Sequence, residues 1–125
     1  VADSWIDTAL QLCAPVPDRA VARVLAPGGR LYSVTPGAQH LWQIKETVYD
    51  RPYPNDEIVP KSPLLEMERQ FRVVQEVQIP APDLQTLFAM TPYYYRTAPT
   101  LRQRLDAIEQ LPVILDFLVT VYKKR

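Results

Sequence analysis

Four consecutive residues, Tyr93, Tyr94, Tyr95 and Arg96, carry the side chains best suited to chemistry with a nucleic acid. The tyrosine rings offer aromatic faces on which an extruded base can stack, and the Arg96 guanidinium can hold a phosphate. Such a cluster can also be a helix end in which at least one tyrosine packs in the core. We expect a mixture of the two, with Arg96 and one tyrosine facing a binding cleft.

Cysteine and histidine each occur once, as Cys13 and His40. A single cysteine excludes a disulfide within the chain, and two such residues are too few for a zinc site of the usual kind, so no metal site is expected here. Nothing near Cys13 in sequence would activate its thiol, so we expect a small buried apolar side chain rather than a nucleophile. The sequence identifies no catalytic residue.

Length and composition indicate one globular domain. The 125 residues fall in the usual range for one domain with one core, and 47% of them are apolar and 22% charged. Fourteen basic residues balance fourteen acidic ones, so no overall field attracts the chain to nucleic acid, and any RNA contact must be local. No apolar run reaches the roughly 20 residues of a membrane helix, and no signal peptide opens the chain, so we expect no membrane partner and a cytoplasmic protein.

Strands and helices alternate in the first part of the chain. Trp5 to Leu12 predicts a strand, Asp18 to Leu25 a short helix, Arg30 to Val34 a second strand and Ala38 to Tyr49 a second helix. Between the first helix and the second strand, the heptapeptide from Leu25 to Leu31 predicts a helix end and a reversal at two glycines. This alternation favours parallel strands joined by right-handed crossovers, and so an open α/β sheet.

The second part of the chain is more varied. Asp50 to Pro63 contains four prolines and predicts an exposed loop. Phe71 to Ile79 alternates as a strand with one better-covered face, and Val113 to Tyr122 is a nearly continuous apolar run, typical of a strand buried on both faces. Helical spacing of apolar residues predicts two further helices, Asp83 to Met90 and Leu101 to Leu111.

Several short segments resemble known methyltransferases. The helix, Pro-Gly-Gly and strand joint from Leu25 to Leu31 is similar to that of class I S-adenosylmethionine-dependent methyltransferases. Three longer pieces, Leu12 to Pro15, Val34 to Leu41 and Ala89 to Arg96, resemble the bacterial large-subunit (23S) ribosomal RNA guanine-N1 methyltransferases. The resemblance covers essentially the whole chain.

This resemblance implies an α/β, Rossmann-like class I methyltransferase half-sheet with flanking helices. The family's sheet has seven strands, and the four expected here would be its strands four to seven, with the last strand antiparallel between the fifth and sixth. The family begins with a zinc module and a glycine-rich cofactor turn. This chain has only Gly28, Gly29 and Gly37, so no Gly-x-Gly-x-Gly turn can be written in it. Residues 1–125 would therefore be the C-terminal part of the methyltransferase domain, and zinc is expected only in the missing N-terminal module.

The resemblance also implies roles for individual residues. His40 would contact S-adenosylmethionine from just inside the helix after the fifth strand, and Cys13, Ala14 and Pro15 would form the wall where base and methyl group meet. The family usually has an aromatic residue at the position of Cys13, so no stacking role transfers to it. Both places follow carboxyl ends of parallel strands, so His40 and Pro15 are expected at the same edge of the sheet. Tyr94, Tyr95 and Arg96 would bind the substrate.

The function that follows is transfer of a methyl group from S-adenosylmethionine to N1 of a guanine in large-subunit ribosomal RNA. The parent protein would be the enzyme, with ribosomal RNA as its partner, and the fragment alone is expected to be inactive. Two alternatives stay open, a fragment of a small-molecule methyltransferase and a non-catalytic binding or self-association module. Trp5 to Leu12 would be an exposed edge in such a fragment, so self-association through this strand is expected.

Overall fold

The computed structural model describes residues 1–125 and contains one four-stranded sheet with flanking helices. The strands follow the order β1-β2-β4-β3, with β1 parallel to β2 and β4 antiparallel to β2. The expected mixed α/β class is confirmed, and the last strand lies between its two predecessors, as the resemblance implies. The strands are β1 (Ile6–Leu12), β2 (Leu25–Pro36), β3 (Leu65–Pro80) and β4 (Gln110–Lys124).

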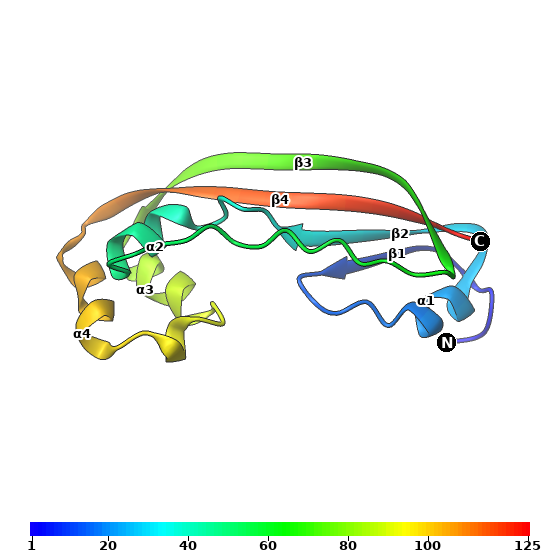
Figure 1. Ribbon diagram of the computed structural model, residues 1–125, viewed down its shortest axis with the longest axis horizontal. Helices are drawn as coiled ribbons and strands as arrows, with labels where there is room; N and C mark the ends of the chain where they lie inside the picture. The colour runs from blue at the N-terminus through cyan, green and yellow to red at the C-terminus, as the bar shows by residue number, and fades with distance from the viewer. The chain divides into compact units, whose positions relative to one another are not determined.

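The crossover from β1 to β2 passes through helix α1 (Asp18–Val24) (Figure 1). The chain enters β2 directly at Leu25, which pairs with Ile6, whereas the next paired residues are Arg30 and Thr8. The predicted reversal is therefore a bulge inside β2 rather than a turn before it. Its two glycines, Gly28 and Gly29, are required for different reasons.

Gly28 has a φ of +76°, in the left-handed region that glycine adopts without steric cost. At Gly29 the constraint is nearby backbone, both of β2 itself and of β1. A Cβ there would lie 2.8 Å from the carbonyl oxygen of Ala26 and 3.2 Å from those of Ile6 and Asp7. Only glycine lets β1 approach this closely, so both glycines are required by the backbone path.

The chain divides into two compact units where its length predicted a single core. The first unit comprises Val1–Ala38, Asp56–Val73 and Phe117–Arg125, and the second comprises Gln39–Asn55 and Val74–Asp116. The core of the first unit is a small buried group of Leu25, Leu31, Leu65 and Tyr122. Apolar residues of α1, among them Val21 and Ala22, pack against this group.

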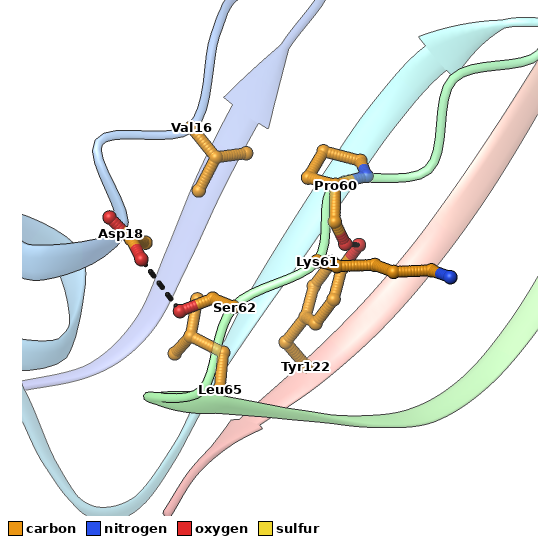
Figure 2. A pocket seen from close by; sticks show the side chains of 7 residues that line it. All are labelled: Val16, Asp18, Pro60, Lys61, Ser62, Leu65 and Tyr122. Atoms are coloured by element: carbon orange, nitrogen blue, oxygen red, sulfur yellow. Dashed lines mark hydrogen bonds between the residues drawn. The ribbon is translucent and has the colours of Figure 1, made fainter.

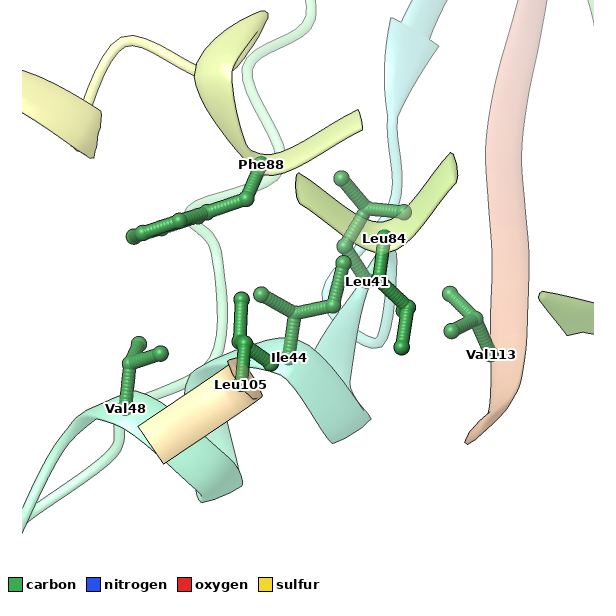
Figure 3. Close-up of a cluster of buried hydrophobic side chains, with 7 residues drawn as sticks. All are labelled: Leu41, Ile44, Val48, Leu84, Phe88, Leu105 and Val113. Atoms are coloured by element: carbon green, nitrogen blue, oxygen red, sulfur yellow. The ribbon is translucent and has the colours of Figure 1, made fainter. Parts of the chain in front are cut away.

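The second unit contains every helix except α1 and has the larger core. Its elements are α2 (Trp42–Val48), α3 (Ala81–Ala89), the 3-10 turn η1 (Tyr94–Arg96), α4 (Pro99–Arg102), η2 (Gln103–Ala107) and the adjoining parts of β3 and β4. Figure 3 shows the buried side chains of its core: Leu41, Ile44, Val48, Leu84, Phe88, Leu105 and Val113. Leu84 and Phe88 point inward from α3, as their spacing predicted.

Two predicted helices have different boundaries in the structure. The helix expected from Leu101 to Leu111 ends at Ala107, and Leu111 belongs to β4. Pro112 explains the extended conformation of Leu111, because a residue that precedes proline is driven out of the helical region. The helix expected from Ala38 starts only at Trp42, since Leu41 has a left-handed φ of 57° and its N–H donates to the Ile114 carbonyl.

The strands β3 and β4 differ in burial. Residues 118–122 of β4 are all buried, which confirms the expectation of a strand covered on both faces. The expectation of one better-covered face on β3 holds only at Val77 and Ile79, which are half-buried while Gln78 is exposed, and it is wrong for residues 66–76, which are exposed throughout. The reason is that β3 lies at the end of the strand order, where one neighbour is missing. Residues 50–61 form no helix or strand and are mostly exposed, so the predicted loop is confirmed.

Candidate functional site

The turn that carries His40 is hydrogen-bonded to β4. The Gln39 N–H donates to Asp116 Oδ2 at 3.1 Å, and the Asp116 N–H donates to His40 Nδ1, also at 3.1 Å. The Leu41 N–H donates to the Ile114 carbonyl oxygen at 2.8 Å. These bonds hold the turn before α2 in place. His40 therefore lies two residues before the helix, and its expected position in the first helical turn is wrong.

His40 is half-buried, and that burial lowers the pKa of its imidazole, with a smaller opposing effect from the Asp116 carboxylate. A second contact fixes its backbone, because Asn55 Nδ2 donates to the His40 carbonyl at 3.2 Å. The bond from Asp116 requires an unprotonated Nδ1, which agrees with the lowered pKa. The ring is thus held in one orientation and in its neutral form near pH 7.

A buried lysine lies next to this turn. Lys45 on α2 is only 3% exposed, and its Nζ donates to Asn55 Oδ1 at 2.6 Å and to the Tyr53 carbonyl at 3.2 Å. The same Nζ lies 4.8 Å from the ring centre of Tyr53 and 5.3 Å from that of Tyr93. Both distances are within the range of cation–π attraction. The ammonium is therefore compensated by carbonyl and amide oxygens and by two rings.

Sequence reasoning missed this lysine, although a signal was present. Lys45 falls four residues after Leu41 and three before Val48, on the apolar stripe of α2. Side chains at this spacing face the core. A charged residue on the stripe is the sign of a buried and compensated cation.

The tyrosine cluster consists of Tyr93 and the three residues of η1 that follow it, and it is divided between core and surface. Tyr93 is half-buried, and burial raises the pKa of its hydroxyl to about 12. Tyr94 packs against Phe88, with ring centres 5.3 Å apart. Tyr95 is 88% exposed, and Arg96 is exposed as well. The expected mixture of packed and exposed residues is confirmed, whereas the substrate role of Tyr94, Tyr95 and Arg96 stays a prediction.

The segment Cys13, Ala14 and Pro15 follows the end of β1. All three residues are exposed, and the Cys13 N–H donates to the Val34 carbonyl at 2.8 Å. The expectation that Cys13 is buried is wrong, because it has a left-handed φ of 50° just beyond the strand and lies in a surface turn. Its exposure leaves this strand end accessible to a ligand.

A cavity of about 190 Å³ lies elsewhere in the first unit (Figure 2). On one wall the Ser62 hydroxyl donates to Asp18 Oδ2 at 2.7 Å, and this bond lowers the pKa of the Asp18 carboxyl. On another wall of the cavity, the Tyr122 hydroxyl donates to the Pro60 carbonyl. Ser62 Oγ also accepts the Leu64 N–H at 3.0 Å. These polar groups are hydrogen-bonded to one another or to nearby backbone, and the bonds fix the loop around Pro60 and Ser62. We therefore assign this cavity a structural role.

The cofactor residues expected from the sequence belong to different units. Cys13, Ala14 and Pro15 are part of the first unit and His40 is part of the second. Their meeting at one edge of the sheet therefore stays a prediction. No group of three or more His, Cys, Asp or Glu side chains gathers in a way that could hold a metal ion. No helix combines the length and the apolar character needed to cross a membrane.

Comparison with known proteins gives matches among solved structures only. No family model matches the chain, and no curated protein matches it. Among solved structures, the chain is similar to a candidate methyltransferase from Bacillus halodurans, with 14% identity and a TM-score of 0.45. The match covers 99% of this chain and 66% of that one, so the chain spans just under two thirds of its neighbour's length. A similarity this low carries no argument about function by itself.

Proposed function

We propose that the chain is the C-terminal part of an S-adenosylmethionine-dependent methyltransferase that methylates N1 of a guanine in large-subunit ribosomal RNA. The strand order carries this proposal. Antiparallel β4 lies between β2 and β3, next to a parallel pair joined by a crossover helix. An ordinary doubly wound sheet has parallel strands in its middle, whereas an antiparallel last strand at this place is what the resemblance implies.

The residues present offer only part of a cofactor site. Cys13, Ala14 and Pro15 present exposed chain beyond the carboxyl end of a parallel strand, which is where ligands of open α/β sheets bind. His40 offers a neutral imidazole in a fixed orientation. The chain has no Gly-x-Gly-x-Gly turn, so these residues alone do not fit S-adenosylmethionine. When bound to the whole protein, the cofactor supplies an activated methyl group.

The exposed residues of η1 support RNA as the substrate. Tyr95 and Arg96 combine an exposed ring with a guanidinium, the groups that stack a base and hold a phosphate. Neither is required for a small-molecule substrate enclosed in a pocket. Alignment of nucleophile, methyl group and sulfur provides much of the rate in methyl transfer, so the role of these residues is to position the guanine.

A second proposal concerns partners and rests on the edge strand β1. Trp5, Leu10 and Leu12 are 70%, 66% and 60% exposed, and β1 ends the strand order. An exposed apolar edge recruits another strand. We propose that β1 pairs with a second copy or with a polypeptide that carries the missing half.

Two measurements test the proposed function. Calorimetric titration of S-adenosylmethionine into the chain should give no stoichiometric binding. Clear binding would contradict the proposal that the chain holds only part of the cofactor site. The full-length parent protein should transfer a labelled methyl group from S-adenosylmethionine to large-subunit ribosomal RNA. Nuclease digestion should then yield 1-methylguanosine. Methylation of small molecules but not of RNA would favour the small-molecule alternative, and no transfer to either would favour the non-catalytic one.

A further inference from the structure

We infer that Tyr95, Arg96 and Arg102 form a contact site for one nucleotide of single-stranded RNA, in which Tyr95, and not Tyr94, stacks on the base. The inference deepens the proposed function and rests on it for the choice of RNA as the ligand. It adds Arg102, which the sequence did not single out, and removes Tyr94 from direct contact with the base.

Tyr94 is excluded because its ring is already surrounded. The Arg102 guanidinium carbon lies 4.5 Å from its ring centre. The rings of Phe88 and Tyr95 approach at 5.3 Å and 5.1 Å, with interplanar angles of 71° and 89°. A base needs an open ring face to stack upon. Tyr94 therefore acts as the support on which both Tyr95 and Arg102 rest.

Tyr95 has the open ring that Tyr94 lacks. It is 88% exposed, the highest value among the large apolar and aromatic side chains on the surface. Its ring contact with Tyr94 is perpendicular, which is an edge-to-face arrangement rather than a parallel stack. An exposed ring braced in this way loses little side-chain freedom when a base binds.

The arginines of this region differ in whether they are already paired. The Arg104 guanidinium lies 2.8 Å from Asp50 Oδ1. Neither Arg96 nor Arg102 forms an ion pair, although both belong to the same short stretch. Two unpaired guanidiniums, one next to Tyr95 in sequence and one against the same supporting ring, are positioned to hold phosphate oxygens.

The local charge favours an anionic ligand. Residues 84–105 contain three arginines and no aspartate or glutamate, in a chain whose overall charge is zero. An acidic peptide could also use the arginines, but it would have no use for the exposed ring of Tyr95. The ring distinguishes the two ligands, so we infer RNA and treat the peptide as an outcome of the test.

The test is fluorescence anisotropy of a fluorescein-labelled, unstructured oligoribonucleotide with the 125-residue chain and five variants. Tyr95→Ala should weaken binding roughly tenfold and Tyr95→Phe should leave it unchanged, because stacking needs the ring and not the hydroxyl. Arg102→Gln should reduce the slope of log K against log salt by about 0.7, the share of one phosphate contact. Arg102→Lys should keep this slope. Arg104→Gln is the matched control and should leave both affinity and slope unchanged.

Several results would overturn the inference. These are equal binding by the wild-type chain and Tyr95→Ala, an unchanged salt slope in Arg102→Gln, or competition by polyglutamate as effective as that of unlabelled RNA. Absence of RNA binding by the wild-type chain would also overturn it. None of these measurements uses the cofactor, so failure here is distinguishable from failure of methyl transfer by the parent protein. Circular dichroism of each variant verifies that the fold is retained.

Discussion

The two units of the chain are stabilised in different ways. The first has four residues in its buried group, and its strands are joined by backbone pairing and by exposed ion pairs such as Arg30 with Glu68. The second has seven buried core residues, packed rings and a buried lysine. Exposed ion pairs contribute little stability. Backbone geometry therefore limits which substitutions the first unit tolerates, and side-chain volume limits those of the second.

The largest expected effect is in the second unit. Phe88 is fully buried, and Phe88→Ala should lower the free energy of unfolding by about 3 to 5 kcal/mol through lost burial and the cavity left behind. The measurement is urea denaturation followed by circular dichroism. Tyr95→Ala is the control, because its exposed ring should cost less than about 0.5 kcal/mol. Similar losses in both variants would contradict a core centred on Phe88.

The next effect tests backbone geometry in the first unit. Gly29→Ala places a Cβ at 2.8 Å from a carbonyl oxygen and should cost about 2 kcal/mol, since the backbone must move. Gly28→Ala meets no atom within 4 Å and should cost only about 1 kcal/mol, for its left-handed φ. Thermal denaturation of both variants provides the comparison. The reverse order of stabilities would show that the backbone of the bulge follows a path different from the one described above.

A third prediction concerns the exposed edge of the first unit. Leu10→Lys puts a charge on β1 and should shift the chain towards monomer, because a charged edge discourages strand pairing. Light scattering in dilute solution gives the mass. Hydrogen exchange of the amides from Trp5 to Leu12 shows whether this strand is the contact. A wild-type monomer whose edge amides exchange freely would end the proposal of association.

The smallest effect is the pH dependence due to His40. Burial holds its folded-state pKa below the ordinary value of 6.5, so the unfolded chain takes up a proton first as the pH falls. The stability that His40 contributes is present above this ordinary value and is lost below it. Unfolding free energies at about pH 7.5 and pH 5.5 should therefore differ more in the wild type than in His40→Gln. Equal differences would show that the imidazole does not titrate in this way.

The elements that the sequence predicted well are those with strong local patterns. The strand from Trp5 to Leu12 and the helix from Asp83 to Met90 were located to within two residues at each boundary, since their apolar spacing reflects their burial. The exposure of β3 could not be predicted, because an alternating pattern does not reveal that a strand lies at an edge. The effect of Pro112 on Leu111 was visible in the sequence but was outweighed by the helical spacing before it.

The candidate site was predicted less completely than the fold. The division of the tyrosine cluster between core and surface followed from its composition. The left-handed turn at Leu41, which takes His40 out of the helix, depends on a hydrogen bond to Ile114, more than 70 residues away in the chain. The stacking of Arg102 on Tyr94 likewise arises from a local fold that spacing does not reveal.

The position of β4 has a consequence for how the protein is made. It lies between β2 and β3 but follows both in the chain, so the ribosome synthesises the middle of the sheet after its neighbours. The edge of β2 from Arg30 to Pro36 therefore stays unpaired until its partner residues 117–123 have been synthesised. At ordinary elongation rates this delay is on the order of several seconds. During that time the nascent chain exposes an unpaired apolar edge, so its yield in cells should depend on chaperones and on translation speed.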